Sequence, residues 1–182
     1  MTNMKHLLPV AIALSTIAAL YAIKYAGRTS HLSISLHAAS KTHSQLVFGG
    51  MIFASTILIT ITLFNEMLPR YNAGLLSYIV FGAIVGFLSL VALVPHVVGT
   101  WREPVHNFVA WGLAWIIPVA MVCMLTWSLT STAWRIGICL TAINIVLIVL
   151  SLLFKKLRQW FLYFQITYLA LFFSFLLVAA YL

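Results

Sequence analysis

The stretch LLSYIVFGAIVGFLSLVALVP, residues 75–95, contains no charged side chain. An α-helix rises about 1.5 Å per residue and the hydrocarbon core of a membrane is about 30 Å thick, so about 20 apolar residues span it. Polar segments flank the stretch on both sides, NEMLPRYNAG before it and HVVGTWREPVH at its end. The stretch therefore predicts a helix that crosses a membrane.

The same length criterion finds further windows along the chain, which bring the number of predicted spans to six. Their approximate ranges are 7–26, 45–65, 75–95, 107–129, 136–154 and 160–181. Because the loops between them are short, consecutive helices must be antiparallel neighbours. We therefore expect an all-α integral membrane bundle of six transmembrane helices, with residues 1–182 forming a single domain.

The composition of the whole chain agrees with a surface that faces lipid. It is 64% hydrophobic and 7% charged over 182 residues, whereas a soluble domain has about 25% charged residues. The formal net charge is +8, but the basic residues lie in the gaps between apolar windows. That placement is typical of membrane topology and of anionic headgroups, so we expect membrane lipids as partners and no nucleic acid.

The distribution of Lys and Arg predicts how the bundle is oriented. Seven of the ten lie in or beside the first, third and fifth loops. The positive-inside rule then makes loops 27–44, 96–106 and 155–159 cytoplasmic, with both termini outside. We expect an inner or plasma membrane location.

Five of the six histidines fall in the first and third loops, which lie on one membrane face: His31, His37, His43, His96 and His106. Imidazole nitrogens are common metal ligands, and the candidates for such a site are His37, His96 and His106. A histidine can also act as a general base beside a serine, so the catalytic candidates are Ser35, Glu103 and His106.

A structural role for the same histidines stays open. His31, His37 and His43 are each six residues apart, which places successive ones about 120° apart around a helix. His96 and His106 could instead end or begin a helix, where polar groups satisfy free backbone donors and acceptors. On this interpretation the protein has no cofactor.

Other residues have predicted roles in lipid contact and in packing. Cations followed by aromatic side chains favour anionic headgroups, which makes Lys155, Lys156, Arg158 and Trp160 the expected headgroup site. Small residues four apart let helix backbones approach closely, and Gly50 with Ala54 and Gly82 with Gly86 have this spacing.

Single residues inside the windows also give expectations. Asn144 is expected to make an interhelical hydrogen bond, and Pro118 to kink the fourth span. Cys123 and Cys139 lie within predicted spans and are expected to be small buried residues.

Two segments resemble a known family. ISLHAA, residues 34–39, and VHNFVAWGLAWIIPVAMVCML, starting at Val105, are similar to segments of a family of small prokaryotic multi-span membrane proteins. The family has no established function and is distantly similar to Frag/DRAM-type proteins. The resemblance implies a multi-span helical fold and points to Ser35 and His106. A second comparison, with membrane hydrolases of the alkaline-ceramidase kind, is weakened because the chain has no aspartate.

Three classes of function follow from these patterns. The first is a non-enzymatic protein whose polar face, built from loops 27–44 and 96–106, interacts with a lipid or small molecule, alone, as an oligomer or in a larger assembly. The second is a membrane-embedded, metal-dependent hydrolase that uses the same-side histidines. The third is a small channel or carrier subunit, for which Thr60, Asn144 and Gln165 would supply the polar path.

Overall fold

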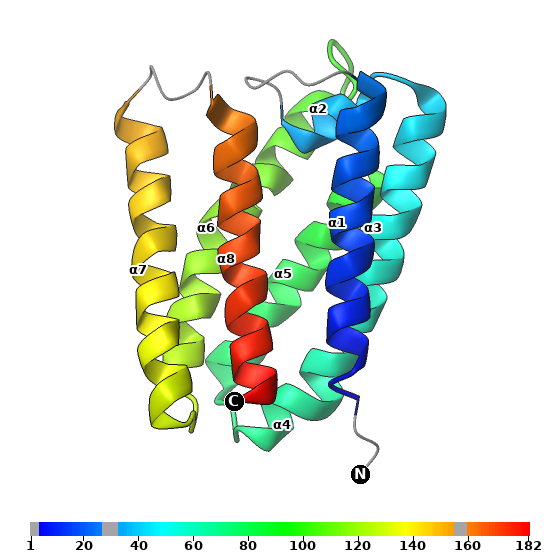
Figure 1. Cartoon of the computed structure of the whole chain (residues 1–182). Coiled ribbons are helices and arrows are strands. Elements are labelled where there is room, and N and C mark those ends of the chain that lie inside the picture. The colour runs from blue at the N-terminus through cyan, green and yellow to red at the C-terminus, as the bar shows by residue number, and fades with distance from the viewer. Residues whose placement is uncertain (1–3, 27–32, 155–159) are drawn as a thin grey trace.

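The computed structural model describes residues 4–26, 33–154 and 160–182, and within these ranges the regular structure is entirely helical (Figure 1). Six helical segments are long and apolar enough to cross a membrane. They are α1 (Leu7–Ala26), Thr42–Arg70, α5 (Leu75–Leu93), α6 (Arg102–Leu125), α7 (Ser131–Leu153) and α8 (Phe161–Tyr181). The predicted all-α membrane bundle is confirmed, and the chain is a multi-pass membrane protein.

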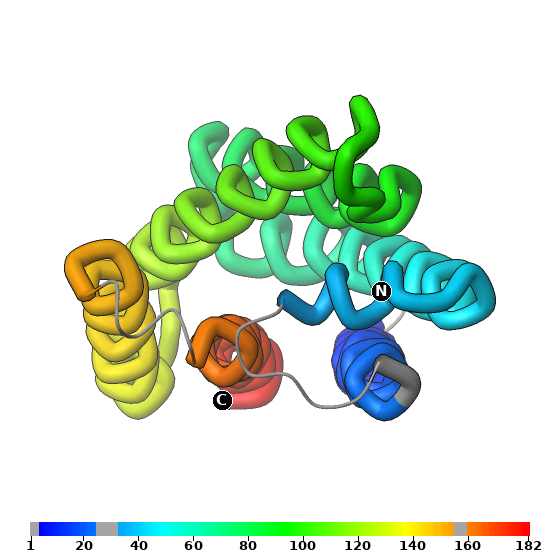
Figure 2. Tube along the Cα trace, turned by 90° about the horizontal axis from the view of Figure 1, so that it is seen from above, coloured from blue at the N-terminus to red at the C-terminus, as the bar shows by residue number. Residues whose placement is uncertain are grey.

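The second span is built from three consecutive elements. It begins as α3 (Thr42–Thr62), passes through the π-helix η1 (Leu63–Met67) and ends as α4 (Leu68–Arg70). A separate short helix, α2 (Ile34–Ala39), lies across one end of the bundle between α1, α3 and α8 (Figure 2).

Helices that follow one another in the chain pack side by side, in the order α1, α3, α5, α6, α7 and α8. The ring closes between the last and first helices at the end that carries both termini, where the Tyr181 hydroxyl donates to the Lys5 carbonyl at 3.0 Å. Leu8 and Ala11 of α1 belong to the same buried cluster as Leu176 of α8. Figure 1 shows α5 and α6 running obliquely behind the steeper α1, α7 and α8.

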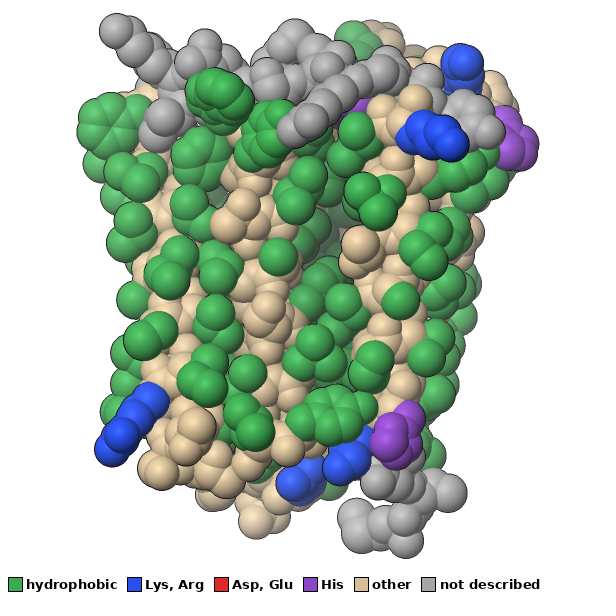
Figure 3. All heavy atoms as spheres, viewed as in Figure 1, with side chains coloured by type: hydrophobic (Ala, Val, Ile, Leu, Met, Phe, Trp, Pro, Cys, Tyr) green, Lys and Arg blue, Asp and Glu red, His purple; other side chains and the backbone are tan. Residues whose placement is uncertain are grey.

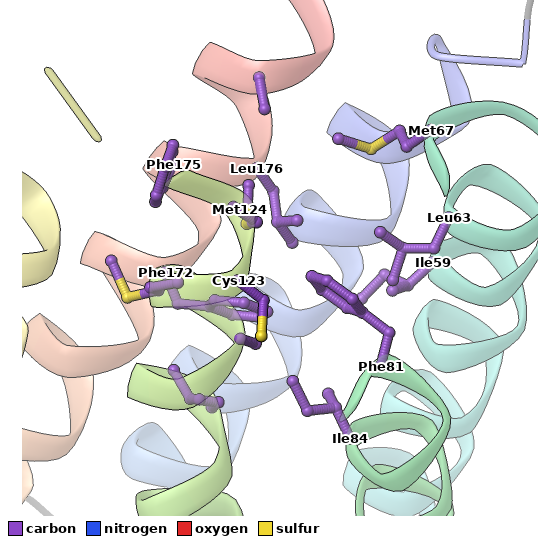
Figure 4. Close-up of a cluster of buried hydrophobic side chains, with 14 of the residues drawn as sticks. Ile59, Leu63, Met67, Phe81, Ile84, Cys123, Met124, Phe172, Phe175 and Leu176 are labelled. Atoms are coloured by element: carbon purple, nitrogen blue, oxygen red, sulfur yellow. The ribbon is translucent and has the colours of Figure 1, made fainter. Parts of the chain in front are cut away.

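The core and the outer surface are both hydrophobic. Side chains from α3, η1, α5, α6 and α8 meet in the core, among them Leu63, Phe81 and Phe172 (Figure 4). Yet only 17% to 44% of the residues in each span's most apolar window are buried inside the chain. On the face in Figure 3 the basic and histidine side chains lie at the two ends, and the band between them is hydrophobic. Lipid tails can cover such a band without cost, whereas water cannot.

The second span is longer than predicted, because the helix continues through the segment expected to be a loop. Pro69 lacks the N–H that an α-helix needs for the Asn65 carbonyl. Just before it the helix widens, and the Leu68 N–H bonds to the Leu63 carbonyl, five residues back. A π-turn of this kind accommodates a proline with little loss of hydrogen bonding. Glu66 therefore lies inside the helix and not after it.

The helix then ends in a Schellman motif at Asn72, which has a positive φ of 46°. The Asn72 N–H bonds to the Pro69 carbonyl at 3.1 Å, and the Ala73 N–H to the Leu68 carbonyl at 3.0 Å. These bonds satisfy carbonyls that would otherwise be free at the helix end.

The predicted loops 27–44 and 96–106 are wrong as continuous loops. The first contains α2 and the beginning of α3, and the second ends when α6 starts at Arg102. Pro104 did not prevent this start, because first-turn N–H groups have no helical partner to lose. Glu103 and His106 are therefore helical residues.

The small residues expected to mediate helix packing do not face another helix closely among the described residues. A Cβ atom placed on Gly50, Gly82 or Gly86 would meet no described atom of another element within 4 Å, and Ala54 is exposed. The close approach is instead at Gly49, where a Cβ would lie 2.7 Å from the Ala92 carbonyl oxygen of α5. Small residues four positions apart lie on one face of a helix. Because these helices are apolar on every face, this spacing does not predict which face is buried.

Asn144 and Tyr168 are among the polar residues of the spans that connect helices. The Asn144 side-chain amide donates to the Tyr168 carbonyl at 3.1 Å, which confirms the expected interhelical bond between α7 and α8. Pro118 leaves the Ala114 carbonyl, four residues before it, without its helical donor. The Tyr168 hydroxyl replaces that donor at 2.7 Å and so joins α8 to α6. Of the two cysteines expected to be buried, Cys123 is buried and Cys139 is exposed.

Candidate ligand-binding cavity

A cavity of about 490 Å³ lies among α1, α6, α7 and α8, below α2. The described residues that line it are mostly apolar, and they include Leu113, Ile117, Leu147, Leu169 and Phe173. Both α1 and α8 contribute to its wall, and Figure 3 shows the surface hollowed between these two helices in the upper half of the view. The cavity therefore faces the lipid-exposed side of the bundle.

The polar groups of the lining lie mainly where α2 and the 94–101 segment meet the spans. At this end they are Ser33 and Ser35 at α2, His96 and His106, Asn107 at the start of α6, and Gln165 of α8. Elsewhere the lining also includes Ser15, Thr16, Ser151 and Tyr168. No Lys, Arg, Asp or Glu is among the described residues that line the cavity. The described part of the lining is thus amphipathic and carries no formal charge.

Helix α2 covers the cavity and is held in place by polar and apolar contacts. Ser33 caps its N-terminus by accepting from the Leu36 N–H at 3.2 Å. The side-chain oxygen of Gln165 accepts from the Ile34 N–H at 3.0 Å, which satisfies a second free donor of this helix end. The apolar side of α2 packs on α1, α3 and α8 through Ile34 and Ala38.

Two histidines pack against each other at the edge of the cavity. The rings of His96 and His106 are 4.9 Å apart between centroids and tilted by 30°. The ring of His106 is 2% exposed, and its Nδ1 lies 2.7 Å from the Val94 carbonyl oxygen. A carbonyl oxygen only accepts, so Nδ1 carries the proton and Nε2 carries a lone pair in the neutral ring. Nε2 is buried and has no hydrogen-bond partner among the described residues.

The environment of His96 favours its neutral form. Burial lowers the pKa of His96 below its usual value, a positive charge on His106 would lower it further, and Glu103 opposes both effects. A buried pair of neutral rings can stack closely, whereas two imidazolium ions would repel. The close packing of the two rings therefore fits a neutral pair.

His37 does not complete a metal site with His96 and His106. It is fully buried in α2, and its Nδ1 lies 2.8 Å from the Ser33 carbonyl oxygen of the preceding turn. In the part of the chain that the structure describes, no three His, Cys, Asp or Glu side chains are grouped so that they could hold a metal ion. The three candidate ligands are therefore not grouped as a metal site in the described structure, where His37 instead contacts its own backbone.

Each of the catalytic candidates makes a contact with a nearby residue. The Glu103 carboxylate accepts from the Gly99 N–H at 2.7 Å, which stabilises the turn before α6. The hydroxyl of Ser35 lies 3.1 Å from that of Ser33. His106 uses its Nδ1 for Val94, and it lines the same cavity as Ser35, so a catalytic role for these residues stays a prediction.

The expected headgroup site is only partly described. Lys155, Lys156 and Arg158 lie outside the described residues. Trp160 is 49% exposed, and its ring lies 5.5 Å from that of Tyr163 at the start of α8. An exposed aromatic pair at a helix end is typical of a membrane interface.

The residues suggested for a channel path satisfy the backbone instead. Thr60 donates to the Thr56 carbonyl at 2.7 Å, and Asn144 donates to α8. Gln165 alone among the three lines the cavity.

Sequence reasoning did not find the cavity itself. The volume of the cavity depends on how far α1 and α8 diverge, which the sequence does not show. The one indication in the sequence was Gln165, a polar residue within an apolar window. Comparisons with protein-family models, with curated proteins and with solved structures give no match to this chain.

Proposed function

We propose that this multi-pass membrane protein binds one amphiphilic molecule from the membrane in the cavity below α2, and that it does not alter the molecule chemically. The observation that carries the proposal is an apolar cavity of about 490 Å³ with polar groups gathered at the α2 end. Ligand sites in proteins usually have volumes of about 300–1,000 Å³, are mostly apolar and contain a few polar groups that fix orientation.

The position of the cavity supports entry from the membrane. Because its wall includes α1 and α8, and the surface between them is hollowed, an acyl chain can enter sideways without leaving the hydrocarbon (Figure 3). The polar headgroup of the bound molecule then remains near the α2 end, where the protein meets the membrane surface.

Two further parts of the proposal concern the membrane surface. We propose that the face carrying α2 is cytoplasmic, because most Lys and Arg lie on that side. We also propose that Lys155, Lys156 and Arg158, with Trp160, contact anionic headgroups there, in addition to the amphiphile in the cavity.

A cavity-filling variant tests the proposed function. Ala110 lines the cavity and is half-buried, so Ala110→Phe should occupy part of the volume. Ala54→Phe is the matched control, because Ala54 is exposed on α3 and does not line the cavity. Native mass spectrometry of protein released from detergent should show a one-to-one lipid adduct for wild type and Ala54→Phe, and a loss of that adduct for Ala110→Phe. Equal occupancy in all three proteins would contradict the proposal.

A further inference from the structure

Residues 94–101 connect α5 to α6, and three contacts hold this segment against α6. His106 Nδ1 donates to the carbonyl of Val94, at the C-cap of α5, at 2.7 Å. The ring of His96 is 8% exposed and lies 4.9 Å from the ring of His106. The Gly99 N–H donates to the Glu103 carboxylate at 2.7 Å. Two of the three contacts therefore depend on the His96–His106 pair.

A proton added to either ring is costly while the rings are packed. His106 Nε2 is buried and has no hydrogen-bond partner among the described residues, so a new N–H at this atom would lack an acceptor. Burial lowers the pKa of His96, and Glu103 only opposes this effect. Positive charges on both rings would repel across the 4.9 Å between them. Rings exposed to water would instead have an ordinary pKa of about 6.5.

The charged groups around the pair do not reverse this direction. A small pocket beside the two rings is lined from α2, α3 and α5, and its described lining contains no titratable side chain other than the pair. Glu103 of α6 is the described carboxylate that acts on His96. The other titratable side chains at this end of the neighbouring elements are His37 of α2, Lys41 and His43 of α3, and Arg102 of α6.

The residues outside the described ranges contain no Asp or Glu. A further cation near the pair would make protonation costlier still. The expected direction therefore does not depend on where those residues lie.

The sign of the pH dependence follows from these costs. Because the packed rings bind a proton less readily than hydrated rings, opening of the segment takes up protons. The packed arrangement keeps its full stability above about pH 6.5 and loses stability as the pH falls below that value. Uptake of one proton shifts the equilibrium between packed and open forms by up to about tenfold per pH unit.

We propose that the His96–His106 pair is a pH-sensitive switch. Protonation separates the two rings, releases residues 94–101 from α6 and opens the α2 end of the cavity. Both histidines line the cavity, so their separation removes part of its wall and promotes release of the bound molecule. This last step rests on the proposed function, whereas the opening of the segment does not.

Hydrogen–deuterium exchange of the wild-type protein in detergent measures the opening of the segment. Protection factors, corrected for the effect of pH on the intrinsic exchange rate, are compared between about pH 7.5 and about pH 5.5. The amides of Gly99 and Thr100 are hydrogen-bonded in the packed segment. Their protection should fall by about threefold or more in acid, while that of the middle of α6 stays constant. Equal protection of the segment at both pH values would overturn the proposal.

Variants assign the effect to the pair. His96→Phe keeps a packed ring that cannot take up a proton, so its change in protection should be smaller than that of wild type. A second substitution in the same protein, His106→Gln, should remove what remains. His6→Gln is the matched control, because His6 is an exposed histidine at the terminal end, and it should retain the full change.

The full wild-type change in His96→Phe would overturn the proposal, because another group would then be responsible. His96→Gln gives the same comparison if His96→Phe does not fold.

Ligand binding at the two pH values separates this inference from the proposed function. The probe is monooleoylglycerol, an amphiphile without a titratable group of its own. Its one-to-one adduct, measured by native mass spectrometry, should be weaker by about threefold or more in acid for wild type and should change less for His96→Phe. Reduced protection with an unchanged adduct would overturn the link between the switch and the cavity. Absence of the adduct at both pH values would contradict the proposed function, while exchange alone decides the switch.

Discussion

Neighbouring glycines in α3 have opposite surroundings, and this contrast shows what a single residue decides in the bundle. Gly49 faces the Ala92 carbonyl of α5, where backbone cannot move aside, whereas Gly50 faces open space outside the chain. Of these two positions, therefore, only 49 must lack a side chain for α3 and α5 to approach this closely.

We predict that Gly49→Ala lowers the free energy of unfolding by about 1–3 kcal/mol, the usual cost of forcing an extra carbon into a packed site. Gly50→Ala should leave it unchanged or raise it slightly, since alanine favours a helix. Unfolding by denaturant in mixed micelles, followed by tryptophan fluorescence, measures both. A similar loss in the two variants would show that the helices do not approach as described.

Tyr168 and Pro118 form a second residue-scale pair. The Tyr168 hydroxyl donates to the carbonyl that Pro118 deprives of its helical donor. Tyr168→Phe should therefore cost about 1 kcal/mol of unfolding free energy, a typical value for a hydrogen bond between membrane helices.

Pro118→Ala provides the control in a double-mutant cycle. It restores an N–H for the Ala114 carbonyl, so the cost of Tyr168→Phe should become smaller in that background. An identical cost with and without Pro118 would mean that the hydroxyl does not serve this carbonyl.

At the scale of elements, α2 is held over the cavity by a side chain from a distant helix. Gln165 bonds to the first N–H of α2, and six residues are too few for a helix to be stable alone. Gln165→Leu should therefore speed hydrogen–deuterium exchange in residues 34–39. Thr167→Leu, an exposed position on the same helix, should not. Unchanged exchange in Gln165→Leu would show that apolar packing alone retains α2.

The sequence predicted elements better than it predicted their ends. The first span was predicted as 7–26 and is Leu7–Ala26, because its apolar window coincides with the helix. α7 begins at Ser131, five residues before the predicted start at 136, because Thr130 accepts from the Ala133 N–H and caps the helix within a polar segment. Hydropathy predicts which residues lie in the hydrocarbon core of the membrane, whereas N-capping determines the residue at which a helix begins.

The candidate site was less predictable than the fold. That His96 and His106 lie near one surface follows from counting spans, but their stacking depends on the path of residues 94–101. The contact of His37 with the Ser33 carbonyl follows from α2, which hydropathy does not detect because the helix is short. The cavity depends on helix tilts that no residue pattern encodes.

At the scale of the whole molecule, the sidedness of the bundle stays a prediction that labelling can test. Ser40 is exposed after α2, and Ser128 is exposed between α6 and α7 at the opposite end. In a background in which Cys123 and Cys139 are replaced by alanine, an impermeant maleimide added to intact cells should label Ser128→Cys and not Ser40→Cys. After lysis both should react. Labelling of Ser40→Cys in intact cells would reverse the orientation.

The contact between Tyr181 and Lys5 that closes the ring of helices affects how molecules could move between the two leaflets of the bilayer. Since α1 and α8 are in contact at the terminal end and the cavity lies toward α2, we expect the hollow between them to open to one leaflet. A molecule from the opposite leaflet would meet the packed ends of these two helices. Occupancy should then report the composition of a single leaflet, and transfer between leaflets would require the two terminal helices to part.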